Sequence, residues 1–152
     1  MIRDVAVEDG DWTAWVAEIQ EEARADARVG LIEVGMHLRN AIVAKLSGQR
    51  TGRRYRVPGT SRTYQASAPG EAPAVLFGQL RNSITASEVE EVDGGLEIEV
   101  GVRSAVPYAR ILEFGGFTGR GKTTYIAQRP YLRNTFEEER GRVTDILRRY
   151  MP

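Results

Sequence analysis

The sequence predicts an α+β domain, in which a long N-terminal helix and a C-terminal helix pack on a small, mainly antiparallel sheet, with a long loop or arm after the first helix. Apolar residues recur at spacings of three and four over residues 12–46 and again over 134–150. They alternate with polar residues over 96–102, which is the period of a strand. A length of 152 residues is usual for one domain, so a single domain over 1–152 is expected.

The first apolar pattern predicts one amphipathic helix whose stripe faces a core. Its members are Trp12, Trp15, Val16, Ile19, Ala23, Ala27, Leu31, Val34, Leu38, Ile42 and Leu46. Asp11 is the expected N-cap and Ser47-Gly48 the expected end. Gly30 and Gly35 each cost up to about 1 kcal/mol of helix propensity. A kink or close packing is therefore expected at these two glycines.

Residues 48–77 carry neither a helical nor a strand period and are punctuated by glycine and proline. This pattern predicts an extended, arginine-rich loop. Unstructured connections longer than about 15 residues are uncommon in compact domains and usually serve a function or become ordered against a partner. We therefore expect this arm to contribute to function.

A β-hairpin is predicted next, with strands from Leu80 to Val89 and from Leu96 to Val102. Asp93-Gly94-Gly95 between them is typical of a hairpin turn. Residues 106–114 open with Pro107 and end at Gly115-Gly116, which favours a short helix, with a strand as the alternative.

The C-terminal part is predicted to hold a glycine-rich loop, a strand from Thr124 to Leu132 and a terminal helix from Asn134 to Tyr150. The helix is expected to turn its apolar residues inward, namely Phe136, Val143, Ile146, Leu147 and Tyr150. Its Glu137-Glu138-Glu139 run is attributed to the helix macrodipole rather than to paired catalytic acids.

Composition excludes several kinds of site. The chain has no cysteine and one histidine, so a disulfide framework and the common zinc ligand sets are excluded, and no metal or cofactor is expected. His37 is expected to be a packed or surface residue. Residues 1–11 hold five charges and no apolar run, which predicts neither a signal peptide nor a membrane-spanning helix. Cytosolic assembly is the resulting expectation.

The charges lie in blocks although the formal net charge is zero. Residues 1–47 carry nine acids and five bases, 48–70 carry five arginines and no acid, 71–100 carry seven acids and one base, and the rest is basic. Such a distribution suits head-to-tail contacts between subunits. The high share of arginine is typical of interfaces and is explained equally well by the codon usage of a GC-rich genome.

Residues 116–123 match the phosphate-binding pattern G-x-x-x-x-G-K-[ST]. A nucleotide site of this kind needs a helix that begins at the lysine. The residues that follow Lys122 are β-branched and aromatic, and Arg129-Pro130 would end any helix within two turns. The pattern therefore favours a flexible surface loop, and the chain is predicted not to be an enzyme.

Seven basic residues in the two loops are the candidate interface or DNA-channel residues: Arg50, Arg53, Arg54, Arg56, Arg62, Arg120 and Lys122. Tyr55 and Tyr64 interleave with the arginines of the arm, so the arm could contact acidic faces of neighbouring subunits or a nucleic acid. An interface ranks first, DNA second and a solvated arm third.

Four segments in order carry a resemblance to a known family: residues 67–74 (SAPGEAPA), 78–84 (GQLRNSI), 107–115 (PYARILEFG) and 129–133 (RPYLR). Together they resemble the tail-component family of tailed phages, whose members are described as neck, tail-completion or head-to-tail joining proteins. The resemblance covers about residues 12–150. The chain departs from the family pattern at Leu76-Phe77-Gly78 and in an expanded loop over 116–122.

This resemblance implies a structural virion protein that forms a homo-oligomeric ring, hexameric like the tail, around the DNA channel of the neck. Its implied partners are the head-closure or connector proteins on one side and the tail-terminator or tail-tube proteins on the other. It implies assembly in the host cytoplasm, no membrane, and at most non-specific contact with packaged DNA. A tail terminator or minor tail protein is the nearest alternative, and a nucleic-acid-binding domain is a further one.

Overall fold

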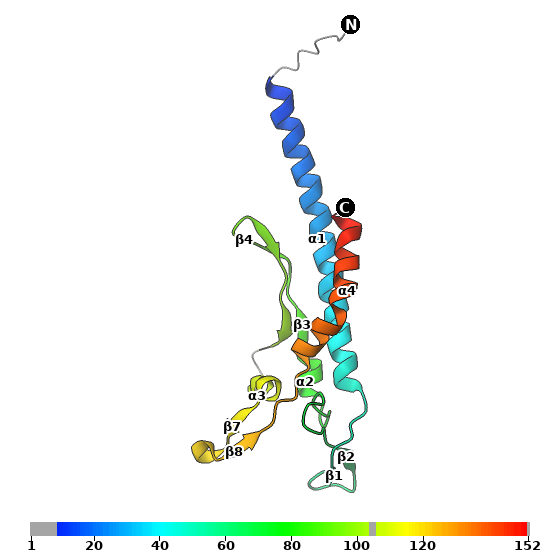
Figure 1. Cartoon of the computed structure of the whole chain (residues 1–152), viewed down its shortest axis with the longest axis vertical. Helices are drawn as coiled ribbons and strands as arrows, with labels where there is room; N and C mark the ends of the chain where they lie inside the picture. Colours follow the sequence, from blue (N-terminus) through cyan, green and yellow to red (C-terminus); the bar gives the residue numbers. More distant parts are fainter. Residues whose placement is uncertain (1–8, 104–105, 152) are drawn as a thin grey trace.

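Figure 1 shows the computed structural model, which describes residues 9–103 and 106–151. The long helix α1 (Asp9–Ser47) runs along the molecule, and the C-terminal helix α4 (Leu132–Tyr150) packs beside its second half. Short antiparallel hairpins complete the chain, so the predicted α+β class is confirmed. The expectation about the N-terminal segment concerns residues 1–11, of which residues 1–8 lie outside the described residues. Within the described ranges, no helix is long and apolar enough to cross a membrane.

The predicted first helix is confirmed, but it begins at Asp9. Asp11 therefore lies inside α1 and is not its N-cap. The helix propensities of Asp9 and Gly10 cost at most about 1 kcal/mol each, so the helical backbone can begin before Asp11. The end at Ser47 agrees with the prediction, and the Ser47 hydroxyl donates to the carbonyl of Val43 at 2.8 Å.

The predicted apolar stripe of α1 is buried only in the second half of the helix. Val34 and Leu38 form a buried cluster with Ile146 of α4, against which Val143, Leu147 and Tyr150 pack. These α4 residues face inward as predicted. Phe136 does not: it is 39% exposed and lines an open groove beside α3 instead of the seam with α1. The helix α4 also begins two residues before the predicted Asn134.

A second, larger cluster lies at the C-terminal end of α1. It consists of Ile42, Leu46, Ala72, Leu80, Ile84, Val106, Ala109 and Tyr131. Ala72 belongs to the segment that the sequence analysis described as an arm. The end of that segment is therefore part of the core.

The two glycines within α1 allow close packing, which was one of the two predicted outcomes. A Cβ atom at Gly30 would lie 3.1 Å from the Cβ of Tyr150, and one at Gly35 would clash with Cδ1 of Ile98. The helix propensity lost at these positions is thus offset by contact with α4 and with the central hairpin.

The central hairpin is confirmed but interrupted. β4 (Glu90–Val92) pairs with β5 (Gly95–Glu97), and β3 (Ile84–Ala86) pairs with β6 (Val100–Val102). Asp93 (φ 49°) and Gly94 (φ 80°) form a two-residue turn with both residues at positive φ. The register changes by one residue between the two ladders, which places a bulge after Ala86.

The predicted strand from Leu80 to Val89 was wrong at its start, where α2 (Gln79–Asn82) forms a helical turn. Gly78, at φ 79°, lets the chain enter this turn. Leu80 of this turn and Ile84 at the start of β3 are both buried in the core. The predicted single sheet was also wrong: the described strands form four separate two-stranded pairs, all antiparallel.

The helix predicted before Gly115-Gly116 is confirmed as α3 (Ala109–Phe114), with Gly115 at φ 71° as its C-cap. The glycine-rich loop after it is a second hairpin, in which β7 (Gly116–Thr118) pairs with β8 (Thr124–Ile126) across a 3-10 turn, η1 (Arg120–Lys122). The strand predicted to reach Leu132 ends at Ile126, because Pro130 and the start of α4 follow.

The arm was predicted to be a loop without regular strands, and this was wrong. It contains a third hairpin, β1 (Arg54–Arg56) with β2 (Thr63–Gln65). Tyr55 and Tyr64 are paired across the ladder and their rings stack with centroids 5.9 Å apart, so a cross-strand aromatic contact supports these short strands.

Candidate interaction surfaces

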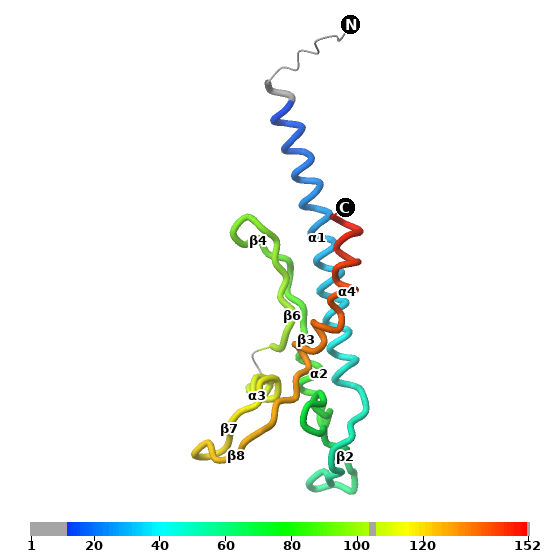
Figure 2. The backbone as a smooth tube through the Cα atoms, in the orientation of Figure 1, coloured from blue at the N-terminus to red at the C-terminus, as the bar shows by residue number. Residues whose placement is uncertain are grey.

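Two hairpins, β1–β2 and β7–β8, project at the same end of the long axis, opposite the free end of α1 (Figure 2). Together they carry six of the seven candidate basic residues, which define what we call the basic end: Arg53, Arg54, Arg56, Arg62, Arg120 and Lys122. Among the described residues, no acid forms a salt bridge with any of these six. The structure thus brings two distant sequence segments to the same end of the molecule.

Arg50, the seventh candidate, lies at the base of the arm and is engaged within its own chain. One guanidinium nitrogen donates to the carbonyls of Lys45 at 2.7 Å, Leu46 at 3.0 Å and Pro73 at 3.0 Å. The first two are carbonyls of the last turn of α1, which lack the i+4 amide of a continuing helix, so Arg50 stabilises the helix end. Burial lowers the pKa of its guanidinium, although it stays charged.

Glu71 joins the two ends of the arm at its base through hydrogen bonds. Its carboxylate accepts hydrogen bonds from the hydroxyl of Thr51 at 2.5 Å, the amide of Thr51 at 3.0 Å and the amide of Ala68 at 2.9 Å. These bonds hold the pKa of Glu71 at about 2, with the Thr51 hydroxyl as the largest cause. The β1–β2 hairpin therefore projects from a fixed base.

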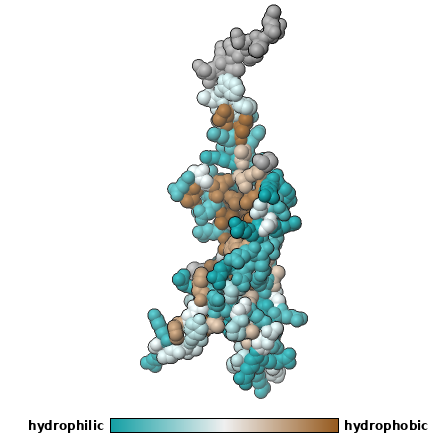
Figure 3. All heavy atoms as spheres, in the orientation of Figure 1, coloured by the Kyte–Doolittle hydropathy of each residue, from teal (hydrophilic) through white to brown (hydrophobic). Residues whose placement is uncertain are grey.

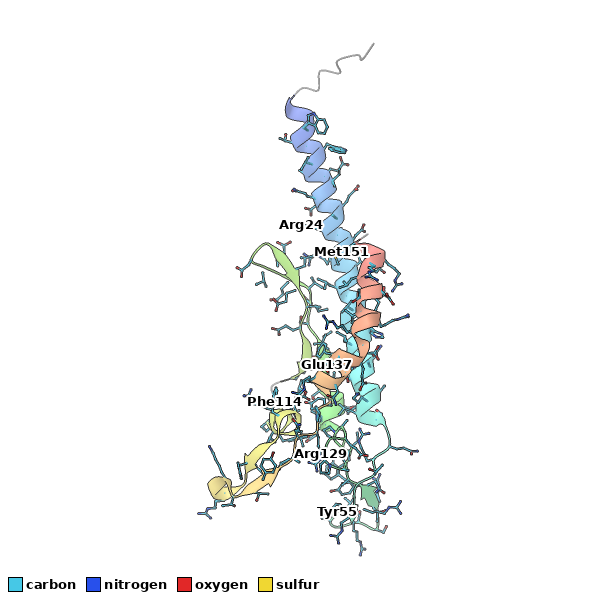
Figure 4. The ribbon with its side chains drawn as sticks, in the orientation of Figure 1. Arg24, Tyr55, Phe114, Arg129, Glu137 and Met151 are labelled. Carbon is cyan, nitrogen blue, oxygen red and sulfur yellow. The ribbon has the colours of Figure 1, made fainter. Side chains whose placement is uncertain are left out.

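Along the β1–β2 hairpin, the side chains of β1 are exposed and those of Tyr64 and Gln65 are half-buried. The guanidinium of Arg53 lies 5.7 Å from the ring centroid of Tyr55, and Nε of Arg56 donates to the carbonyl of Thr60 at 2.9 Å. Figure 4 places Tyr55 at the tip of the molecule. Arg54 and Arg62 are exposed as well. The surface combines cations with an aromatic pair, as interfaces and nucleic-acid grooves do.

The β7–β8 hairpin has the same combination. Phe117 and Tyr125, each 63% exposed, meet edge to face with ring centroids 5.3 Å apart. Arg120 and Lys122 lie in the turn, where Lys122 has a φ of 52°. A strand, β8, follows the lysine, so the helix N-terminus that a phosphate-binding loop needs is not formed here. The strand predicted to begin at Thr124 is therefore confirmed at its start.

The other half of the molecule is mainly acidic. The segment 88–99 of the central hairpin carries six acids and no base, and the exposed half of α1 carries four acids against two bases over residues 12–29. Arg24 and Arg28 of α1 face this hairpin, and their guanidinium groups lie 3.9 Å and 3.5 Å from a carboxylate oxygen of Glu91 (Figure 4). Arg148 and Arg149 lie in this half too, where they pair with Asp145 and Glu33.

The Glu137-Glu138-Glu139 run has a different explanation from the predicted one. Because α4 begins at Leu132, these acids lie after the first turn and gain little from the helix dipole. Instead, Glu138 pairs with Lys45 of α1 at 2.6 Å, and Glu139 contacts Nε2 of His37 at 2.7 Å. His37 is a half-buried residue of the α1–α4 seam, as the sequence analysis expected of a packed or surface histidine.

Glu113 of α3 is a buried carboxylate that the sequence analysis missed. It is 4% exposed, and it accepts hydrogen bonds from the backbone amides of Tyr131 at 2.8 Å, Leu132 at 3.0 Å and Arg133 at 2.9 Å. It therefore caps the N-terminus of α4 from another helix. No local sequence signal points to this role, because the amides that Glu113 accepts from lie 18 to 20 residues further along the chain.

The first half of α1 departs most from expectation. Trp12 (51% exposed), Trp15 (53%), Val16 (43%) and Ile19 (44%) were predicted to face a core, but no described part of the chain covers them. The reason is length, because α4 ends at Tyr150, beside Gly30. Figure 3 shows hydrophobic surface on this projecting part of α1.

The residues in the described ranges form no cluster of three or more metal-ligating side chains. Against known proteins, the sequence model of the phage virion morphogenesis family matches residues 7–152. No curated protein and no solved structure matches the chain.

Proposed function

The chain belongs to the phage virion morphogenesis family, and from this membership we propose that it is a structural protein of the virion neck that joins head to tail as part of a homo-oligomeric ring around the DNA channel. Its partners are other copies of itself, the head-closure or connector layer, and the tail-terminator or tail-tube layer. Assembly takes place in the host cytoplasm. The role is structural rather than catalytic.

The observation that carries this proposal is the distribution of charge along the molecule. The basic end holds six cations without a salt-bridge partner in the described residues, and the central hairpin and the projecting half of α1 hold an excess of acids. Opposite charges on different faces favour head-to-tail contacts between identical subunits. Such heterologous contacts generate a ring when the rotation closes.

Imaging of purified virions by cryo-electron microscopy tests the position directly. Density for this chain in a ring at the head-to-tail junction is the expected result. Density in the tail tube or at its tip would assign the chain to the tail terminator or minor tail proteins instead. Absence from mature particles would overturn the structural role.

A charge-reversal variant tests the basic end. Replacing Arg54 and Arg56 by glutamate is expected to leave unjoined heads and tails in lysates, because repulsion replaces attraction across the contact. The matched control is Arg140→Glu, an exposed position of α4 away from the basic end. Equal yields of joined particles for both variants would contradict the proposed contact.

A DNA-binding role is the second candidate, since each basic hairpin combines its cations with a pair of aromatic rings of which at least one is exposed. If all six cations contact phosphates, log K for duplex DNA should fall with log salt with a slope of about −5. Lys122→Ala should then reduce this slope by about one unit. No measurable binding at low salt would remove this candidate.

A further inference from the structure

The exposed residues Trp12, Trp15, Val16 and Ile19 of α1 form what we call the apolar stripe. Their spacing, i, i+3, i+4 and i+7, is that of a helix that lays its apolar face into a groove. The ring planes of Trp12 and Trp15 meet at 81° with centroids 5.5 Å apart, so the two indoles form one protruding knob. Exposed apolar patches of this kind mark interaction sites.

An open groove of about 540 Å³ lies between α3 and the start of α4. Its apolar lining includes Val102, Val106, Phe114, Leu132 and Phe136. Phe114 is 61% exposed, and Figure 4 places it on α3, toward the end of the molecule that carries the basic hairpins. Three arginines line the same groove: Arg103, Arg110 and Arg133.

The charged residues around the apolar stripe and those that line the groove have opposite signs. Four acids follow or flank the stripe on α1: Glu18, Glu21, Glu22 and Asp26. None of the three groove arginines forms a salt bridge with a described residue. Pairing of two stripes with each other would instead bring like charges together, which disfavours an α1–α1 contact.

The groove of the same chain is out of reach for the stripe. The helix α1 is continuous from Asp9 to Ser47, and it holds the stripe at one end of the molecule while α3 lies toward the other (Figure 1). The segment from Asp9 to Val29 is about 30 Å long at 1.5 Å per residue. The apolar stripe therefore does not reach the groove of its own chain.

We propose that the apolar stripe of one copy docks into the α3–α4 groove of the next copy, with the α1 acids against Arg103, Arg110 and Arg133. This inference rests on the proposed ring and names the contact that builds it. Stripe and groove are different surfaces, so each copy offers one of each and the contact propagates from copy to copy.

The native tryptophans report on this contact, because the chain's two tryptophans are both in the stripe. With rising concentration of the purified full chain, the emission is expected to shift to the blue and acrylamide quenching to weaken as sedimentation shows association. Tryptophans that stay exposed in a monomer up to the highest soluble concentration would overturn the proposal. So would burial that occurs only after another virion protein is added, because the occupant would then be that protein.

Complementary variants provide the sharper test. Val16→Glu with Ile19→Glu disables the stripe and keeps both tryptophans, and Phe114→Glu with Arg110→Glu disables the groove. All four positions are exposed, so the folds should persist, as far-ultraviolet circular dichroism can verify. Each variant alone is expected to lose association by at least about tenfold, which is about 1.4 kcal/mol.

When the two variants are mixed, the stripe of the groove variant can still enter the groove of the stripe variant. The expected product is a 1:1 dimer that grows no further. Ile32→Glu, at an exposed apolar position of α1 outside the stripe, is the matched control and should assemble as the wild type does. Normal assembly of either double variant alone, or no dimer in the mixture, would overturn the docking. The virion imaging decides the neck role independently of these results.

Discussion

Replacing Glu113 by alanine removes the cap that joins α3 to the start of α4. The amide of Tyr131 then loses its acceptor in a buried environment, which costs about 1–3 kcal/mol. The amides of Leu132 and Arg133 are half-buried and can find water, so they add less. Loss of a negative group at a helix N-terminus costs a further ~0.3–2 kcal/mol. We expect a total destabilisation of about 3 kcal/mol.

Glu113→Gln refines this prediction. One carboxylate oxygen serves Tyr131 and Leu132 and the other serves Arg133. Glutamine keeps one acceptor and turns the other into a donor that faces an amide, so roughly half of the stabilisation should remain. The control Glu137→Ala, at an exposed acid of α4, should change stability by less than about 0.5 kcal/mol.

Urea unfolding followed by far-ultraviolet circular dichroism measures these differences. With a slope of about 2 kcal/mol/M, Glu113→Ala should lower the midpoint by about 1.5 M. A midpoint change indistinguishable from that of Glu137→Ala would show that the cap does not hold α4. Equal losses for Glu113→Ala and Glu113→Gln would refute the assignment of separate acceptors to the two oxygens.

Three further substitutions probe the core and the base of the arm. Gly35→Val should destabilise the fold by about 1–3 kcal/mol in urea unfolding, because its side chain overlaps Ile98, and a wild-type midpoint would contradict that packing. The Thr51 hydroxyl holds the pKa of the Glu71 carboxyl at about 2, below its ordinary value of 4.5. The ionised carboxylate therefore stabilises the fold at pH values above 4.5, and this stabilisation is lost as the pH falls from 4.5 toward 2. Glu71→Gln should therefore lower the melting temperature at pH 7 and flatten its decline below pH 4.5, and an unchanged acid profile would exclude this role. Tyr131→Phe removes a buried hydroxyl without a partner in the described residues, so thermal unfolding should show a neutral effect or a gain of up to about 1 kcal/mol, and a clear loss would reveal a missed hydrogen bond.

Local signals predicted several elements correctly. The Asp93-Gly94 turn was readable because few residues other than glycine and asparagine or aspartate adopt positive φ readily. The helix α3 was readable from Pro107 at its start and Gly115 at its end. Failures occurred where a short segment takes its structure from a distant contact, as in the arm, whose two ends meet through Arg50 and Glu71.

The identity of the candidate basic residues was predictable from the sequence, but their arrangement in the fold was not. The charge blocks identified the basic residues, yet nothing local indicates that the β1–β2 and β7–β8 hairpins lie at one end of the molecule. Likewise, Arg50 looked like its neighbours in sequence, and only the fold aligns its guanidinium with the carbonyls that end α1. The Glu113 cap joins residues 18 or more positions apart and has no motif of its own.

The sequence by itself determined the α+β class, the two long helices, the central hairpin and the segregation of charge, because each depends on periodicity or composition within one segment. Tertiary structure alone decided which half of the α1 stripe is covered. A periodic pattern shows that a helix has an apolar face but not what packs on that face, since this depends on where α4 ends. In this chain α4 ends beside Gly30, and the apolar stripe from Trp12 to Ile19 stays open to a partner.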